Sequence, residues 1–309
     1  MMLYKFLDPK NDVAFRKIFG TEKNKDILIH FLNDMITFKE AEPIEDVTFL
    51  KTIQDPETAA KKTSIVDILC KDGKGNQYIV EMQVAKDKGF VKRAQYYAAK
   101  AYICQSNVGG KYHNLKEVVF LAISDFIMFP EKKNYKSDHV ILDKKTHEND
   151  LKDFSFTFLE MPKFKLKIDE LTTITDKWMY FFKHGGETSE KDLLKIIGSD
   201  QIIERAYDEL NRFSWNEEEL LTYEQAEKYE KSYVASMDQK FDEGIEIGEQ
   251  RGLKKGEQLG LEKGEQLGLE KGKNHIACIM LQKGMDIESI CEITELSVET
   301  VKSLLKKVR

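Results

Sequence analysis

The chain has 309 residues, of which 41% are hydrophobic and 33% charged, and its formal net charge is −6. This composition fits a globular core with a smaller appended module, and it excludes a basic surface spread over the whole molecule. The apolar runs are too short to span a membrane, and the four cysteines lie far apart, in no C-x-x-C pair. We therefore expect a cytoplasmic protein with reduced thiols and no membrane association.

The N-terminal part of the chain predicts two helices and a strand. A helix over 13–19 follows a turn and ends at Gly20, with Asn11 or Asp12 as its N-cap. A second helix over about 24–36 carries a single apolar stripe, and the alternating pattern of 47–53 predicts a strand.

The stretch 64–84 predicts a β-hairpin. Two apolar, β-branched runs, 65–70 and 78–84, flank the five-residue polar segment 72–76, which contains two glycines. Apolar runs separated by a short glycine-bearing segment are typical of paired antiparallel strands.

Each run of this hairpin carries a carboxylate, Asp67 in the first and Glu81 in the second. If the loop closes symmetrically, the two lie opposite each other, and Gln83 points to the same face as Glu81. Facing like charges repel, and a charge on an apolar strand is costly unless it is neutralised. A divalent cation between the two carboxylates would remove both penalties. The alternative is that Asp67 and Glu81 lie on a solvated sheet face.

A helix over about 90–105 follows the hairpin and carries basic and aromatic residues together. Arg93 and Tyr97 are four residues apart and share a stripe, and Lys92 lies on the adjoining one. This face could hold a phosphate. The alternative is an ordinary solvated face with tyrosines half buried against the sheet. Two further buried strands are predicted, over 116–124 and 154–160.

The order helix, three strands, helix, strand is that of the PD-(D/E)xK nuclease core. Six motifs between residues 5 and 185 occur in the matching order: D-P-K-N-D-V-A-F-R-K-I-F-G, V-D-I-L, I-V-E-M-Q, R-A-Q-Y-Y, E-M-P-K-F and D-K-W-M-Y-F. With these motifs the chain resembles the family of transposases and recombination-promoting nucleases with a PD-(D/E)xK-type core. The resemblance implies a metal-dependent DNA endonuclease of bacterial or phage origin, with Mg²⁺, Mn²⁺ or Ca²⁺ as cofactor and DNA as partner.

The resemblance also assigns catalytic residues. It makes Asp67 and Glu81 the acidic residues of the motif and the metal ligands, and it places Gln83 where the motif has lysine. Glutamine can orient a water by hydrogen bonds but carries no charge. Asp12 is the candidate third carboxylate, or else a plain N-cap, and Val66 replaces the proline of the motif. An alternative function is a non-catalytic DNA- or partner-binding protein that uses a weakened nuclease core as scaffold.

Glycine occupies every fourth position from Gly244 to Gly272. Each glycine inside a helix costs about 0.8–1 kcal/mol relative to alanine, so an isolated helix of this sequence should melt. The repeat is therefore either a seam where two helices approach closely, which would make the chain a homo-oligomer, or a flexible arm. We favour helical pairing, because a flexible linker needs no exact period.

The tail after the repeat predicts three short helical segments, with Asp286 and Ser297 as N-caps. It resembles a helix-turn-helix, but its charges balance, so a docking or dimerisation module is an equal alternative. We expect an α/β fold: a restriction-endonuclease-like mixed sheet flanked by helices, then a helical region, a glycine-periodic helical arm and a small helical tail. The corresponding domains are the core over 1–185, a helical extension over 186–243, the arm over 244–273 and the tail over 274–309.

Overall fold

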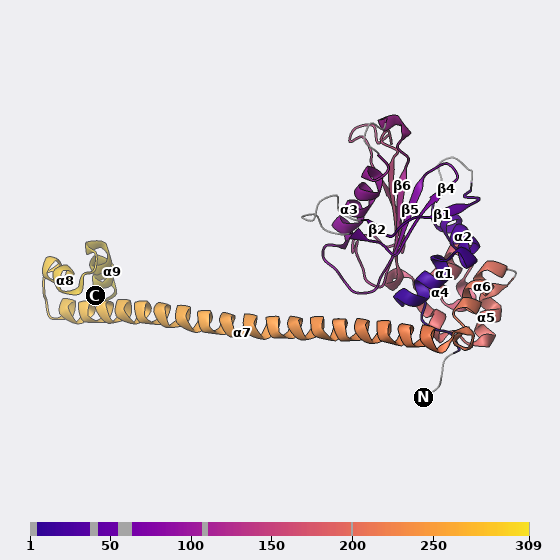
Figure 1. The fold of residues 1–309 in the computed structure, drawn as a ribbon. Coiled ribbons are helices and arrows are strands. Elements are labelled where there is room, and N and C mark those ends of the chain that lie inside the picture. The colour runs from indigo at the N-terminus through magenta and orange to yellow at the C-terminus, as the bar shows by residue number, and fades with distance from the viewer. Residues whose placement is uncertain (1–4, 38–42, 55–63, 107–110, 199, 309) are drawn as a thin grey trace. The chain divides into compact units, whose positions relative to one another are not determined.

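The computed structural model describes residues 5–37, 43–54, 64–106, 111–198 and 200–308. The chain divides into two compact units, Met1–Val234 and Ala235–Arg309. The first unit is built around a six-stranded mixed sheet with helices on both faces, and the second is helical (Figure 1).

The strands are β1 (Val47–Phe49), β2 (Ile53–Gln54), β3 (Ser64–Ile65), β4 (Ile68–Asp72), β5 (Gln77–Gln83), β6 (Val118–Ser124), β7 (Lys136–Val140) and β8 (Phe154–Glu160). The α-helices are α1 (Asp12–Phe19), α2 (Lys25–Met35), α3 (Phe90–Ile103), α4 (Ile174–His184), α5 (Glu190–Ile197), α6 (Gln201–Glu209), α7 (Glu217–Gln282), α8 (Ile287–Thr294) and α9 (Val298–Val308). The 3-10 helices are η1 (Glu22–Asn24), η2 (Tyr112–Asn114), η3 (Met161–Lys163), η4 (Ile168–Glu170), η5 (Gly185–Glu187) and η6 (Arg212–Ser214).

The sheet has the strand order β1-β4-β5-β6-β8-β7. β5, β6 and β8 run parallel, whereas β1, β4 and β7 pair antiparallel with their neighbours. Antiparallel β4 and β5 are joined by a tight turn, while parallel β5 and β6 need a crossover, which contains α3. β2 and β3 form a separate two-stranded ladder.

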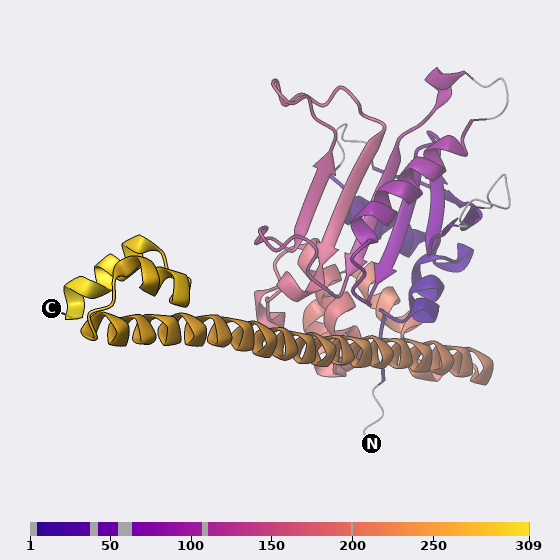
Figure 2. The same cartoon turned by 90° about the vertical axis from the view of Figure 1, so that its left-hand side faces the viewer.

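Helices lie on the two faces of the sheet (Figures 1 and 2). The side chains of each face belong to a separate apolar cluster. Val80 and its cluster pack against α1, α2, α4 and α6, with Phe31 fully buried among them. Ile79, the preceding residue of β5, belongs to the other cluster, which also contains Ala94 of α3 and Phe120 of β6. Side chains alternate along a strand, so β5 contributes to both clusters at once.

An aromatic group on α4 fixes this helix to the core. Trp178, Phe181 and Phe182 are fully buried, and the ring of Trp178 lies 5.2 Å from that of Phe31. Tyr180 is only partly buried at the edge of the cluster. The apolar and aromatic residues of α4 therefore pack against the core.

Most predicted elements are present within a few residues of their expected bounds, but two predicted strands are wrong and one observed strand was not predicted. The predicted strand over 65–70 is divided, because β3 ends at Ile65 and β4 begins at Ile68, so Asp67 lies in neither. The single strand over 47–53 is wrong, because β1 ends at Phe49 and β2, which begins at Ile53, pairs with β3. β7 was not predicted, because its sequence K-S-D-H-V is polar and lacks an alternating apolar pattern. Such a strand is acceptable at the edge of a sheet, where only one side of the ladder is paired.

The second unit holds the glycine repeat and three packed helical segments. The repeat lies entirely within α7 and is therefore helical, whereas the pairing of two such helices stays a prediction. Ala277, Ile290 and Val301, from α7, α8 and α9, form a small buried cluster. Among the described residues, no helix is long and apolar enough to cross a membrane. The domain division at 185, 243 and 273 stays a prediction.

Candidate active site

The turn between β4 and β5 sets the register of these two strands; Glu81 lies on β5, and Asp67 lies one residue before β4. Ile68 lies opposite Val80, and continuing this register by one residue places Asp67 opposite Glu81. The structure thus brings the two carboxylates together, as the hairpin pattern predicts.

Each carboxylate accepts a hydrogen bond from a backbone N–H beside the other carboxylate. The N–H of Asp67 donates to Oε1 of Glu81 over 3.3 Å, and the N–H of Met82 donates to Oδ2 of Asp67 over 3.0 Å. These reciprocal hydrogen bonds close the open end of the hairpin. They fix both side chains in an orientation that strand pairing alone would not determine.

Glu81 lies inside the protein and not on a solvated face. Its exposed fraction is 6%, so the solvated alternative is wrong for this residue. Burial and the charge of Asp67 raise the pKa of the Glu81 carboxyl, and the positive charge of Arg93 opposes this rise. Ionising both carboxylates is therefore unfavourable unless more positive charge is present.

Arg16 of α1 supplies positive charge to this pair from the other side. Its Nη2 lies 2.9 Å from Oδ1 of Asp67, and its side chain is 51% exposed whereas that of Asp67 is 12% exposed. We did not expect a role for Arg16 from the sequence. The available signal was its position four residues after Asp12, which places both on one face of α1.

Asp12 lies close to the pair but does not cap the helix. The N-cap of α1 is Asn11, whose side chain accepts from the N–H of Val13, so the plain N-cap alternative is wrong for Asp12. Asp12 keeps contact with solvent, yet desolvation by the surrounding protein and the charge of Asp67 raise the pKa of its carboxyl. The charge of Arg16 counteracts this rise.

Gln83 is engaged by an arginine from the facing helix. Nη2 of Arg93 donates to Oε1 of Gln83, and Nε2 of Gln83 donates to the carbonyl of Ala85 over 2.8 Å. Nη1 of Arg93 also pairs with Asp87 at 3.0 Å. The guanidinium of α3 therefore stands next to the position where the nuclease motif has its lysine.

Tyr97 and Lys92 differ in their relation to the acidic pair. Tyr97 is half buried, and desolvation together with the charges of Glu81 and Asp67 raises the pKa of its hydroxyl. Its ring lies 6.0 Å from the guanidinium of Arg93. Lys92 is exposed on α3. The structure thus gathers Arg93 and Tyr97 at the site and leaves Lys92 on the surface of the helix.

The donor set fits a hard divalent cation. Mg²⁺ takes oxygen ligands and binds through one or two carboxylates together with water and substrate phosphate. Asp67 and Glu81 supply such a pair, and burial together with the charge of Asp67 raises the pKa of Glu81. The buried Nε of Arg93 has no hydrogen-bond partner among the described residues. No cluster of three or more His, Cys, Asp or Glu side chains that could hold a metal occurs in the described ranges.

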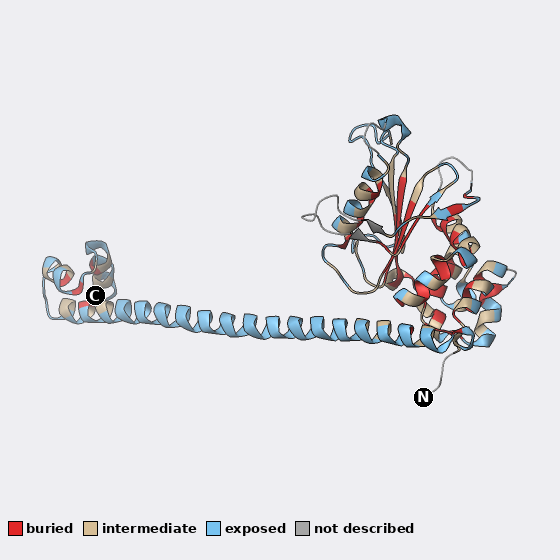
Figure 3. Cartoon of the chain, in the orientation of Figure 1, coloured by how far each residue is buried: buried red, intermediate tan, exposed pale blue. Residues whose placement is uncertain are grey.

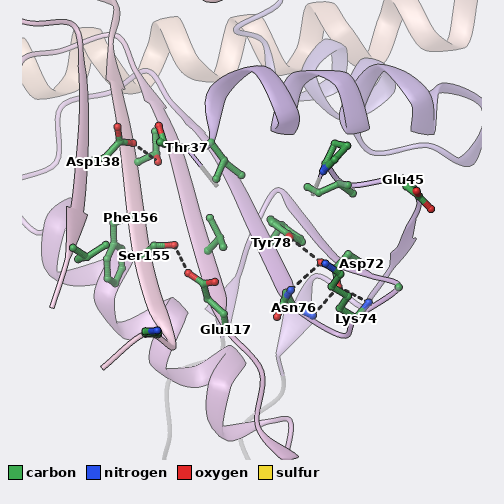
Figure 4. Close-up of a pocket in the computed structure, with 18 of the residues that line it drawn as sticks. Thr37, Glu45, Asp72, Lys74, Asn76, Tyr78, Glu117, Asp138, Ser155 and Phe156 are labelled. Carbon is green, nitrogen blue, oxygen red and sulfur yellow. Dashed lines mark hydrogen bonds between the residues drawn. The ribbon is translucent and has the colours of Figure 1, made fainter. Parts of the chain in front are cut away.

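A large cavity lies elsewhere, beside the turn of the hairpin (Figure 4). It has a volume of about 780 Å³, and three of its carboxylates are hydrogen-bonded within the chain: Asp72 accepts from Tyr78, Glu117 from Ser155, and Asp138 from Thr157. Acidic walls disfavour the phosphates of DNA. The Asp67–Glu81 pair lies away from this cavity, at the other end of β5.

A known protein family matches most of the chain. A family model described as PD-(D/E)XK nuclease family transposase matches residues 9–239. The match includes every residue named at the site. No curated protein and no solved structure matches the chain.

Proposed function

Since the chain belongs to the PD-(D/E)XK nuclease family of transposases, we propose that it is a divalent-metal-dependent endonuclease that hydrolyses phosphodiester bonds of DNA. Family membership implies a function related to nuclease activity or transposition. The observation that carries the finer proposal is the facing pair of Asp67 and Glu81, of which Glu81 is buried at 6% exposure.

Asp67 and Glu81 hold the cation in this proposal, and Asp12 completes the acidic environment from α1. Mg²⁺, Mn²⁺ or Ca²⁺ are the candidate cations, and a catalytic one among them supplies Lewis-acid polarisation of a phosphoryl oxygen. The backbone donors of Asp67 and Met82 keep the two carboxylates in place before any substrate arrives. Preorganisation of this kind avoids reorganisation during the reaction.

Arg93 supplies the positive charge that Gln83 lacks. The lysine of the motif would stabilise charge that develops on the phosphate, and an uncharged glutamine cannot do so. Gln83 instead accepts a hydrogen bond from Arg93 and so positions a guanidinium beside Glu81. Arginine binds phosphate through a planar fork of donors, and its Nε is still without a partner in the described chain. Gln83 also orients the attacking water, and Tyr97 and Lys92 line the approach of DNA.

Arg16 is the counter-ion of Asp67 in the absence of DNA and cation. Its half-exposed side chain can leave the carboxylate at small cost, because exposed ion pairs contribute little. Once released, it is placed to contact the DNA backbone. This motion frees an oxygen of Asp67 for the cation.

The finer architecture belongs to the same proposal. The sheet corresponds to a restriction-endonuclease-like core, and the tail of α8 and α9 acts as a helix-turn-helix-like docking module. Self-association through α7 would give two cleavage sites, one for each strand of a duplex. In this proposal the protein is cytoplasmic, and its origin is bacterial or phage.

A second candidate function is a non-catalytic DNA- or partner-binding protein. The ion pair between Arg16 and Asp67 favours it, because a cation already neutralises one of the two carboxylates. The absence of the lysine charge at Gln83 favours it as well. In that case the first unit is a scaffold.

Plasmid cleavage by the purified full-length chain separates the two functions. We expect nicked and linear DNA with Mg²⁺ or Mn²⁺ and intact plasmid with EDTA. Asp67→Asn and Glu81→Gln should both be inactive while folding normally. Glu117→Gln is the matched control, since Glu117 is a half-buried carboxylate hydrogen-bonded to Ser155 away from the site. Cleavage by Glu81→Gln at the parental rate would contradict the proposal.

A further inference from the structure

The glycine repeat of α7 forms a helix that is not buried against any other described part of the chain. All residues from 244 to 272 are exposed (Figure 3). A Cβ added at any of the eight glycines would meet no atom within 4 Å. Glycines weaken an isolated helix, and most of the stability of protein helices comes from packing of one face. The repeat therefore lacks the contact that would stabilise it.

The residues between the glycines fall into three rows with different chemistry. We call them the acidic, basic and polar rows, at one, three and two positions after each glycine. The acidic row is Ile245, Glu249, Leu253, Glu257, Leu261, Glu265 and Leu269. The basic row is Ile247, Arg251, Lys255, Leu259, Lys263, Leu267 and Lys271. The polar row is Glu246, Gln250, Lys254, Gln258, Glu262, Gln266 and Glu270.

These rows define an amphipathic face. The glycine row is flanked on one side by leucines and glutamates and on the other by leucines and basic residues. The seven apolar residues of the two flanks are between 46% and 70% exposed. The polar row lies behind the glycines and contains no apolar residue. The apolar residues of this face therefore favour burial against a partner, whereas the polar row favours contact with water.

The four-residue period determines the handedness with which two helices would wind around each other along this face. Four residues of an α-helix turn by about 400°, so each row advances by about 40° for every repeat. A repeat longer than 3.6 residues per turn winds right-handed. Helices that approach closely at small residues four apart also cross with a right-handed angle. Continuous contact is thus geometrically possible although the rows spiral.

The charges of the two flanks select the orientation of the partner. When two identical helices pair in parallel about a two-fold axis, the acidic row of each lies against the basic row of the other. In an antiparallel pair, acidic rows meet each other and basic rows meet each other. Opposite charges at such flanking positions set partner and orientation in paired helices.

We propose that a second copy of this chain docks on the glycine row of α7 in parallel, with each acidic row against the basic row of its partner. The occupant is a second copy, because one sequence carries both complementary rows. None of the charged side chains of the two rows forms an ion pair within the described chain, so all are available to the partner. The inference gives an orientation to the self-association in the proposed function, but its tests need neither DNA nor metal.

The first test measures the mass of the full-length chain by light scattering. The parent should be a dimer. Reversing the basic row with Lys263→Glu and Lys271→Glu should raise the dissociation constant at least about tenfold, since like charges would then face each other. The matched control reverses two charges of the polar row, Glu262→Lys and Glu270→Lys, and should remain dimeric.

A mixing experiment tests the complementarity directly. The acidic-row variant Glu257→Lys, Glu265→Lys should dissociate like the basic-row variant, and an equimolar mixture of the two should recover the dimer mass. A monomeric parent, or a polar-row control that dissociates equally, would overturn the proposal. So would a mixture that stays monomeric.

Cross-linking tests the orientation. Gly248→Cys and Gly272→Cys are made separately with Cys104, Cys278 and Cys291 replaced by serine, so that only buried Cys70 remains. A short bismaleimide should join each cysteine to its own counterpart in a parallel dimer. An antiparallel pair could join at most one of these two positions, and that result would overturn the parallel orientation. These outcomes are independent of cleavage, so failure here leaves the nuclease proposal testable.

Discussion

The hairpin of β4 and β5 and the glycine repeat of α7 position charged residues in opposite ways. In the hairpin, Asp67 and Glu81 are fixed by strand register, two backbone hydrogen bonds and Arg16. In the repeat, the charges are equally regular in the sequence, but all are exposed, and those of the acidic and basic rows form no ion pair among the described residues. Charged residues can therefore be held in regular positions either by the fold of one chain or by contact with a partner chain.

Because of this difference, substitutions in the two regions should have different effects. A residue of the first unit acts through a core that already exists in one chain. A residue of the repeat acts on association, and it should leave the core unaffected. The following changes test this separation, from the largest expected effect to the smallest.

Removing a core side chain should have the largest effect. Phe31 is fully buried against Phe19 and Trp178, so Phe31→Ala should lower the free energy of unfolding by about 3–5 kcal/mol. Leu261 is 66% exposed, and Leu261→Ala should change core stability by no more than about 0.5 kcal/mol. Denaturation can be followed by Trp178 and Trp215, which both lie in the first unit. A comparable loss in both variants would contradict the separation.

Moving the positive charge at the site tests the pairing of Gln83 with Arg93. Arg93→Gln should lower the single-turnover cleavage rate by about 10²–10³, the usual effect of losing one preorganised donor. Gln83→Lys alone would place a second cation against Arg93 and should not raise the rate. The double variant Gln83→Lys, Arg93→Gln should recover most of the parental cleavage rate, because the lysine then supplies the positive charge from β5. If Arg93→Gln cleaves like the parent, Arg93 has no role in stabilising phosphate charge.

The pKa of Glu81 predicts a pH dependence of stability in metal-free protein. Burial and the charge of Asp67 raise this pKa above the ordinary value of 4.5, so the folded state holds the proton more tightly than the unfolded state. Stability from this group is present at low pH and is lost as the pH rises from the unfolded-state pKa to the folded-state pKa, by about 1.4 kcal/mol for each pH unit of that window. The free energy of unfolding of the parent minus that of Glu81→Gln should therefore fall across this window. A difference that is constant with pH would contradict the buried acidic pair.

The smallest effect is expected at Arg16. Its ion pair with Asp67 is half exposed, so Arg16→Met should lower stability by about 1 kcal/mol or less. The same variant should bind Mn²⁺ more tightly, because the cation no longer competes with the guanidinium for Asp67. Arg205→Met, which removes an exposed arginine paired with Asp26, is the control. Weaker Mn²⁺ binding in Arg16→Met would show that Arg16 assists the site instead of competing for it.

The sequence predicts the hairpin and its acidic pair because loop length and strand alternation are local properties. It does not predict Arg16, because α1 and β4 meet only through packing of distant elements. The contact of Arg93 with Gln83 is likewise absent from the local pattern, although the stripe on α3 is visible. β7 escapes prediction because an edge strand needs no apolar alternation. The rows of the repeat are fully visible in the sequence, yet only the exposed helix shows that they lack a partner.

Calorimetric titration of Mn²⁺ into the full-length chain tests the central claim most directly. The parent and Glu117→Gln should bind, whereas Glu81→Gln and Asp67→Asn should lose binding, since each lacks one of the two carboxylates. Binding to Glu81→Gln with the affinity of the parent, or no binding to the parent, would contradict a metal-dependent site at the Asp67–Glu81 pair.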